Sequence, residues 1–156
     1  MRVKMENQES SPTKPSSDTL PWYKNGLNFK CTECGKCCTG SPGYVWVSED
    51  EMMAMAAALN VSLDLFKRKY IRQSDNRYAL IEKKSQHFDC IFLKDRKCLV
   101  YQARPIQCRT FPWWKENLGS EESWKKASES CEGINEQAPL IPYSEIVQLG
   151  NSTATF

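Results

Sequence analysis

The stretch CTECGKCC, from Cys31 to Cys38, decides the fold, with further cysteines at Cys34 and Cys37 and a glycine at Gly35. In a C-x2-C turn the backbone can direct two sulfurs at one ion, and a glycine after the second cysteine permits a positive φ. A helix would also gather the sulfurs, because at about 100° per residue the four positions share one face. Both conformations stay open. In an extended chain the side chains of the adjacent Cys37 and Cys38 would point in different directions, so the two would not share one metal centre equally.

The second half of the chain carries four further cysteines, which brings the total to eight. Thiolate is a soft ligand that suits zinc, copper(I) and iron–sulfur clusters, and eight thiolates suit two four-sulfur sites or one polynuclear site. The alternative is that they serve as small core hydrophobes, because free cysteine is among the most buried residue types. We predict that all eight bind metal: Cys31, Cys34, Cys37, Cys38, Cys90, Cys98, Cys108 and Cys131.

The N-terminal sequence bears on whether these cysteines form disulfides, because secretion exposes thiols to oxidation. Residues 1–20 contain no apolar run of about 7–15 residues and no small-residue cleavage site, so they do not resemble a secretory signal. The apolar stretch from Met52 to Leu59 is shorter than the roughly 18–20 residues that span a bilayer. The sequence therefore predicts a reduced, cytoplasmic protein without a membrane partner, in which dense cysteines favour metal over disulfides.

Length and charge limit the remaining possibilities. A chain of 156 residues suits one domain, and 21 basic against 19 acidic residues give a net charge of +2. This balance lacks the strong positive field typical of nucleic-acid binding, so it argues against a nucleic-acid partner, and it identifies no protein partner. We expect a disordered tail over residues 1–20, a cysteine-cluster metal-binding domain over 21–135 and a C-terminal extension over 136–156.

Local patterns predict a small α+β domain stabilised by metal, with short helices, a β-hairpin and limited regular structure. Ser48 and Glu51 form a capping box before an amphipathic segment, which predicts a helix from about residue 49. Ser62 can cap a second short helix that runs to about Tyr70. Strands are expected at residues 44–47 and 77–82.

The cysteines of the second half fall on further short elements. Residues 90–93 and 98–101 flank a charged turn and predict a hairpin with one cysteine at the start of each arm. Pro105 suits the first turn of a short helix that would carry Cys108. Later helices are expected over residues 122–130 and 141–150. The ligands must therefore converge from separate parts of the chain.

Several blocks of sequence together resemble one known family. CTECGKCC is followed by CLVY at residues 98–101 and by RPIQCRTFP at residues 104–112. These blocks, in this order, closely resemble the C-x-x-C-x-x-C-C cysteine-cluster family, also called YkgJ-like and described as zinc- or iron-chelating. The resemblance implies that all eight cysteines belong to one metal-chelating core, and it carries no settled enzymatic activity. A related module is similar to part of the flagellin lysine methylases, where an iron–sulfur cluster is implied.

The function that follows is metal binding, with zinc or iron as the cofactor. The turn at Gly35 favours zinc, whereas C-x2-C-x2-C resembles the ligation of iron–sulfur ferredoxins. One alternative is an iron–sulfur-dependent redox or protein-modification enzyme, although the chain has no glycine-rich loop for S-adenosylmethionine. A second alternative is a zinc-dependent nucleic-acid-binding module. No catalytic residue can be named, because no Ser/His/Asp set, carboxylate pair or phosphate loop stands out.

Two arginines and the single histidine near the later cysteines also bear on the predicted metal site. Four thiolates around a 2+ ion leave a net charge of −2, which Arg104 and Arg109, on either side of Cys108, could offset. We single out Arg109 for this role because it follows Cys108 directly. His87, the only histidine, lies three residues before Cys90, but eight sulfurs already fill two tetrahedral shells and we do not expect it to be a ligand.

Overall fold

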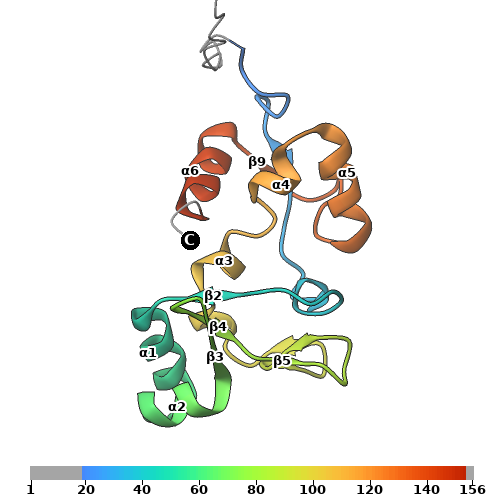
Figure 1. Cartoon of the computed structure of the whole chain (residues 1–156). Coiled ribbons are helices and arrows are strands. Elements are labelled where there is room, and N and C mark those ends of the chain that lie inside the picture. Colours follow the sequence, from blue (N-terminus) through green and yellow to red (C-terminus); the bar gives the residue numbers. More distant parts are fainter. Residues whose placement is uncertain (1–18, 154–156) are drawn as a thin grey trace, which may run out of the picture.

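The computed structural model describes residues 19–153, which form two lobes, one above the other in Figure 1. Short helices and small antiparallel strand pairs make up both lobes, which confirms the predicted α+β class. The predicted disordered tail lies outside the described residues except for Thr19 and Leu20. Within the described part, no helix has both the length and the apolar character needed to cross a membrane.

The lower lobe in Figure 1, here called the sheet lobe, holds two of the longer helices and most of the strands. Its helices are α1 (Glu49–Ala58) and α2 (Leu63–Tyr70), followed later by the 3-10 turn η2 (Tyr101–Ala103). Its strands are β2 (Trp46–Val47), β3 (Ile71–Ser74), β4 (Arg77–Leu80), β5 (Glu82–Lys83), β6 (Asp89–Cys90), β7 (Leu93–Lys94) and β8 (Lys97–Cys98). Strands β2, β4 and β3 form an antiparallel sheet in that order, and β5–β6 and β7–β8 are separate pairs.

Local signals account for both helices of the sheet lobe. The Ser48 hydroxyl accepts a hydrogen bond from the Glu51 backbone N–H, and the Glu51 carboxylate accepts one from the Ser48 N–H, so the predicted capping box forms. Ser62 caps α2 through the backbone N–H of Leu65, also as predicted. Both helix starts are therefore fixed by side chains adjacent in sequence.

An apolar core closes beneath these helices. Met52, Met55 and Phe66 are fully buried, and Phe92 is 1% exposed. The rings of Phe66 and Phe92 lie 5.9 Å apart between centroids. Each side chain of this size contributes about 1.5–3 kcal/mol on burial, so the sheet lobe has a core of its own.

The upper lobe, here called the helical lobe, contains α4 (Lys115–Leu118), α5 (Glu121–Ser130) and α6 (Tyr143–Thr153). Trp113 is 2% exposed, and its ring stacks on Trp124 of α5 at 5.3 Å between centroids. Phe29 meets the same Trp113 ring edge-on at 5.5 Å, and Ile146 of α6 is fully buried. Aromatic packing therefore holds this lobe, and Trp113 belongs to its core.

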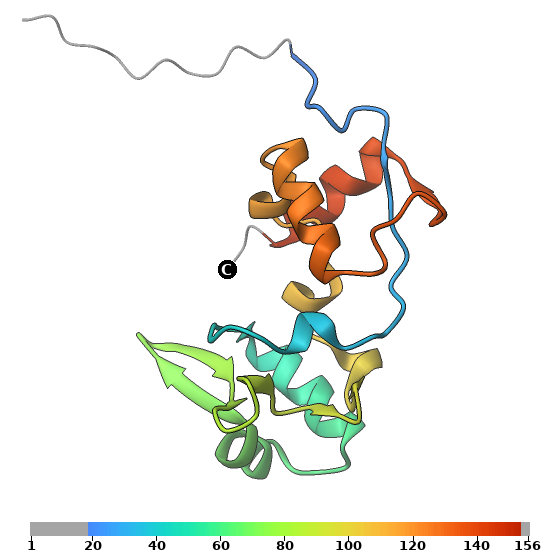
Figure 2. The same cartoon turned by 90° about the vertical axis from the view of Figure 1, so that its right-hand side faces the viewer.

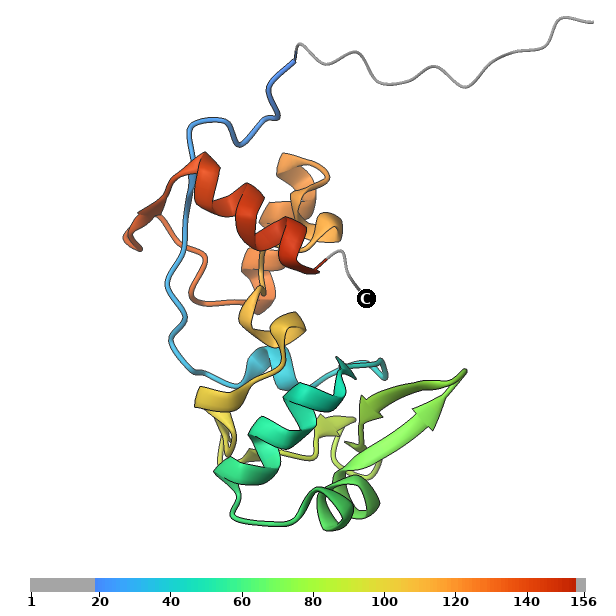
Figure 3. The same cartoon turned by 90° about the vertical axis from the view of Figure 1, so that its left-hand side faces the viewer.

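Two segments connect the lobes. The segment before residue 36 runs along the helical lobe and then passes between the lobes, where it forms the 3-10 turn η1 (Lys36–Cys38) (Figures 2 and 3). On its way, β1 (Leu27–Asn28) pairs with β9 (Leu140–Ile141). The short helix α3 (Ile106–Arg109) also lies between the lobes, and Pro105 precedes it as expected.

The hairpin predicted around Cys90 and Cys98 differs from the observed pairing. Strands β7 and β8 form a tight hairpin in which Leu93 pairs with Cys98. Cys90 instead pairs with Glu82 through β5 and β6. The two cysteines thus lie on consecutive strand pairs rather than at the starts of opposite arms.

Candidate metal centre

All eight cysteines line one cavity of about 110 Å³, in the region where the lobes meet. The CTECGKCC stretch supplies four of them, and α3 supplies Cys108. The sheet lobe contributes Cys90 and Cys98, and the residue that follows α5 in the helical lobe is Cys131. Cys31 and Cys37 are exposed and the other six are half-buried. Residues up to 100 positions apart therefore converge, as the metal hypothesis requires.

The first motif adopts the turn conformation rather than the helical one. Gly35 has φ = 74°, in the left-handed region, and η1 begins at the next residue. A Cβ on Gly35 would lie 2.7 Å from the carbonyl oxygen of Arg96 and 2.8 Å from the Leu93 side chain. Glycine is therefore required here by both the backbone conformation and the close approach to the β7–β8 hairpin.

Backbone N–H groups point at three of the later sulfurs. Cys90 and Cys98 each accept a hydrogen bond from the backbone of the residue two positions ahead, Phe92 and Val100 respectively. Cys131 accepts from the backbone N–H groups of the second and third residues that follow it. Such donors stabilise a thiolate more than a thiol, as a metal ligand at these positions would need.

The cavity disfavours free thiolates. Burial raises the pKa of Cys90 to about 11, and burial also raises the pKa of Cys98 and of Cys108. The sulfurs of Cys37 and Cys38 lie 3.9 Å apart; their hydrogen bond lowers the pKa of Cys37 to about 7 and raises that of Cys38. A cation entering this cavity would bind with release of protons, because the metal competes with hydrogen for the sulfurs.

Arg104 is the arginine whose charge acts on the sulfurs. Its charge adds to the hydrogen bond with Cys38 in lowering the pKa of Cys37, and it partly offsets the burial that raises the pKa of Cys98 and of Cys108. Its guanidinium lies 3.5 Å above the ring of Tyr101. Arg109 lines the same cavity, but its side chain is exposed. The role expected for Arg109 beside Cys108 stays a prediction.

Tyr101 is a cavity residue that the sequence analysis did not assign. A hydrogen bond with Cys31 raises the pKa of the Tyr101 hydroxyl. The residue belongs to the block CLVY, so that block was the available signal. Tyr101 therefore connects the first cysteine of the motif to the Arg104 side chain that lies above its ring.

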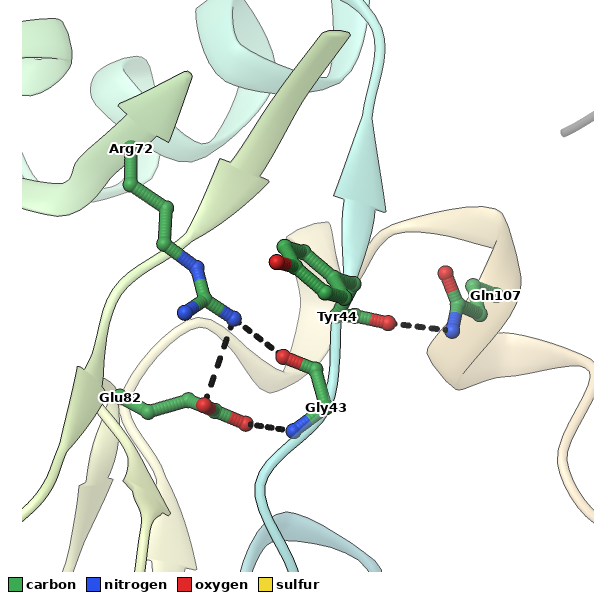
Figure 4. Close-up of polar contacts among 5 residues, drawn as sticks. All are labelled: Gly43, Tyr44, Arg72, Glu82 and Gln107. Carbon is green, nitrogen blue, oxygen red and sulfur yellow. Dashed lines mark hydrogen bonds and ion pairs between the residues drawn. The ribbon is translucent and has the colours of Figure 1, made fainter. Parts of the chain in front are cut away.

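An ion pair fixes the chain just beyond the motif (Figure 4). The Glu82 carboxylate accepts a hydrogen bond from the Gly43 backbone N–H at 2.9 Å, and Arg72 donates to the Gly43 carbonyl oxygen. Arg72 and Glu82 also contact each other at 3.3 Å. On the other side of this chain, Gln107 of α3 donates to the Tyr44 carbonyl oxygen at 2.9 Å. The Arg72–Glu82 pair therefore binds both the backbone N–H and the carbonyl oxygen of Gly43, five positions after Cys38.

His87 takes no part in the cavity lining. Its side chain is exposed, and its carbonyl oxygen accepts a hydrogen bond from the Gly40 N–H at 3.0 Å. The residue therefore fits the expectation that it is not a ligand.

The sulfurs share the cavity without closing around one point. Within residues 19–153, no three His, Cys, Asp or Glu side chains are arranged to hold a metal ion as they stand. The cavity is also several times larger than the roughly 10–15 Å³ that one water-sized sphere occupies. The donor set is that of a thiolate metal site, and the sulfurs would have to move inward around the metal.

This fold and this cavity define a small α+β protein organised around a cluster of cysteines. The chain belongs to the CxxCxxCC family, described as "Putative zinc- or iron-chelating domain", whose family model matches residues 30–132. The chain is also 31% identical over 93 residues to an uncharacterized protein of Methanocaldococcus jannaschii. That match covers 58% of this chain, which spans about half (48%) of the relative. No solved structure matches the chain.

Proposed function

We propose that the cavity between the lobes binds zinc or iron through cysteine thiolates. The observation that carries the proposal is the convergence of all eight cysteines on one cavity. Soft thiolates select zinc or iron–sulfur clusters over hard cations, and the family description names the same metals. For iron, the form that a set of thiolates favours is an iron–sulfur cluster.

The ligand count supports a structural role for the metal. Eight sulfurs suffice for two four-coordinate shells without water, and closed shells are typical of structural sites. The metal would join segments that are far apart in the sequence, from Cys31 to Cys131. Under this proposal residues 21–135 form the metal-binding unit, and the protein works in a reducing compartment such as the cytoplasm, because oxidation would consume the ligands.

Anaerobic purification followed by elemental analysis tests the proposal. We expect zinc or iron at a fixed ratio to protein, and a visible absorption band if the iron is held in a cluster. Colourless protein with zinc would favour structural zinc, and coloured protein with iron and acid-labile sulfide would favour a cluster. Purified protein that is folded but contains neither metal, and that takes up neither on reconstitution, would disprove the proposed function.

A further inference from the structure

The two halves of the CTECGKCC stretch are fixed to different parts of the molecule. Before Cys31, the Lys30 backbone N–H donates to the Gly133 carbonyl oxygen at 3.0 Å. A Cβ on Gly133 would lie 2.4 Å from the Lys30 carbonyl oxygen, so only glycine permits this approach. The chain around Cys31 is therefore held directly beside the loop that carries Cys131.

The Glu132 side chain extends the same attachment. Its carboxylate accepts a hydrogen bond from the Thr32 hydroxyl at 3.0 Å and pairs with the Lys36 ammonium at 3.1 Å. These two partners lie on either side of Cys34. Backbone and side-chain contacts thus place the first two cysteines of the motif with Cys131, on the side of the helical lobe.

After Cys38 the chain is fixed to the sheet lobe instead. The Thr39 hydroxyl donates to the Asp89 carboxylate, next to Cys90, and the Gly40 N–H donates to the His87 carbonyl oxygen at 3.0 Å. Gly35, between the two attachments, packs against the turn of the β7–β8 hairpin. The last cysteine of the motif is therefore placed with the strand pairs of the sheet lobe.

The two adjacent cysteines of the motif lie where these attachments meet. The sulfurs of Cys37 and Cys38 are 3.9 Å apart, and Cys38 directly precedes Thr39, which is attached to the sheet lobe.

We propose that the eight cysteines form two four-sulfur sets and that the motif divides between its two adjacent cysteines. Contacts with the loop after α5 assign three residues to the outer set, and a four-coordinate shell requires one more. We assign Cys37 as the fourth, because Cys38 adjoins the attachment of Thr39 to the sheet lobe. The outer set is Cys31, Cys34, Cys37 and Cys131. The inner set is Cys38, Cys90, Cys98 and Cys108. This division rests on the proposed function.

Stepwise removal of metal from the intact, metal-loaded protein tests the division. The protein is titrated with a chelator, followed by native mass spectrometry, and alkylated with iodoacetamide at each step. Because Cys31 and Cys37 are the exposed members, we expect a half-loaded species in which the four outer cysteines are alkylated and the four inner ones are protected. Loss of all metal in one step, or alkylation that mixes the two sets, would overturn the proposal.

Matched substitutions supply a second test. We expect Cys34→Ser to lose about half of the metal and retain the inner set, and Cys98→Ser to lose the other half. Cys37→Ser should behave as Cys34→Ser does. If Cys37→Ser lost all metal while both other variants kept half, Cys37 would bridge one polynuclear centre and the two-set division would be wrong. A parent protein without metal would instead disprove the proposed function itself.

Discussion

The apolar core of the sheet lobe and the cysteine cavity beside it are stabilised in different ways. In the core, Met52, Met55 and Phe66 are fully buried in one apolar cluster. In the cavity, half-buried thiols surround open space, and burial raises the pKa of Cys90 and Cys108. The core is complete as it stands, whereas under the proposed function a cation would bring the sulfurs of the cavity together.

This difference predicts two levels of stability in one small chain. The core depends on burial of apolar area, which needs no ligand. The junction between the lobes depends on a site whose occupation can contribute about 10–16 kcal/mol when structural zinc binds cysteine-rich peptides. Metal should therefore control the junction more strongly than it controls the core.

The largest expected effect is that of metal removal. We predict that a strong chelator under reducing conditions releases the segments that face the cavity, around residues 29–40 and 131–134, while the segments of α1 and α2 stay protected. Hydrogen exchange measured by mass spectrometry on loaded and stripped protein checks this. Equal loss of protection in α1 and α2 would show that the core does not stand alone, and unchanged exchange throughout would show that metal stabilises neither region.

Truncation of the core is the converse experiment. Phe66→Ala should lower the free energy of unfolding by about 3–5 kcal/mol, because it leaves a cavity beside Phe92. Metal content per folded molecule should change much less than stability, since Phe66 itself does not line the cysteine cavity and reaches it only through Phe92. Urea unfolding of the metal-loaded protein, with elemental analysis of the folded fraction, measures both. The matched control is Leu65→Ala, at a neighbouring side chain that is 41% exposed and should cost much less.

The parts of this molecule that could be predicted from sequence are those with local causes. The capping residues Ser48 and Ser62 fix helix starts through neighbours three positions away, and both helices form as expected. At Gly35 the sequence left a turn and a helix open, and the structure has the turn. Each of these features depends on residues that are adjacent in the chain.

Features that depend on distant contacts could not be predicted. The pairing of Cys90 with Glu82 is decided by the strand that precedes it, and the hairpin pattern contains no signal for that choice. Whether Arg104 or Arg109 acts on the sulfurs depends on how α3 and the residues just before it are oriented between the two lobes. The cysteine spacing predicted a metal site, but the division of its ligands that we propose rests on the contacts of Glu132 and Asp89, which the sequence does not show.

The ion pair of Arg72 and Glu82 attaches the chain at Gly43, five positions after Cys38, to strands β3 and β5, so its loss should affect both stability and the motif. Charge-assisted hydrogen bonds contribute about 1.5–3 kcal/mol each, and Arg72→Gln removes those to Gly43 and to Glu82. We expect lower stability towards urea and faster loss of metal to a chelator. Arg77→Gln is the matched control, because Arg77 is exposed and lies over the Trp46 ring, 3.8 Å from its centroid. If both variants behaved alike, the contacts with Gly43 would have no role in holding the motif.

The smallest expected effect concerns the charge beside the sulfurs. Arg104→Gln should keep the fold but weaken metal binding by roughly 10–100-fold, as is typical when a group that supports the ligands is lost. Because the Arg104 charge favours the thiolate forms of Cys37 and Cys98, its removal raises their affinity for protons, and the deficit should grow as the pH falls.

Two further variants separate the causes. Arg104→Lys keeps the charge but loses the planar guanidinium above Tyr101, so affinity restored by lysine would identify charge as the cause. Arg109→Gln, at the exposed arginine of the same cavity, should change affinity little. Metal affinities of all three variants, measured by competition with a chelator from acidic to neutral pH, decide between the two arginines. A larger loss of metal affinity for Arg109→Gln than for Arg104→Gln would show that Arg109, next to Cys108, supports the ligands, as its position in the sequence predicts.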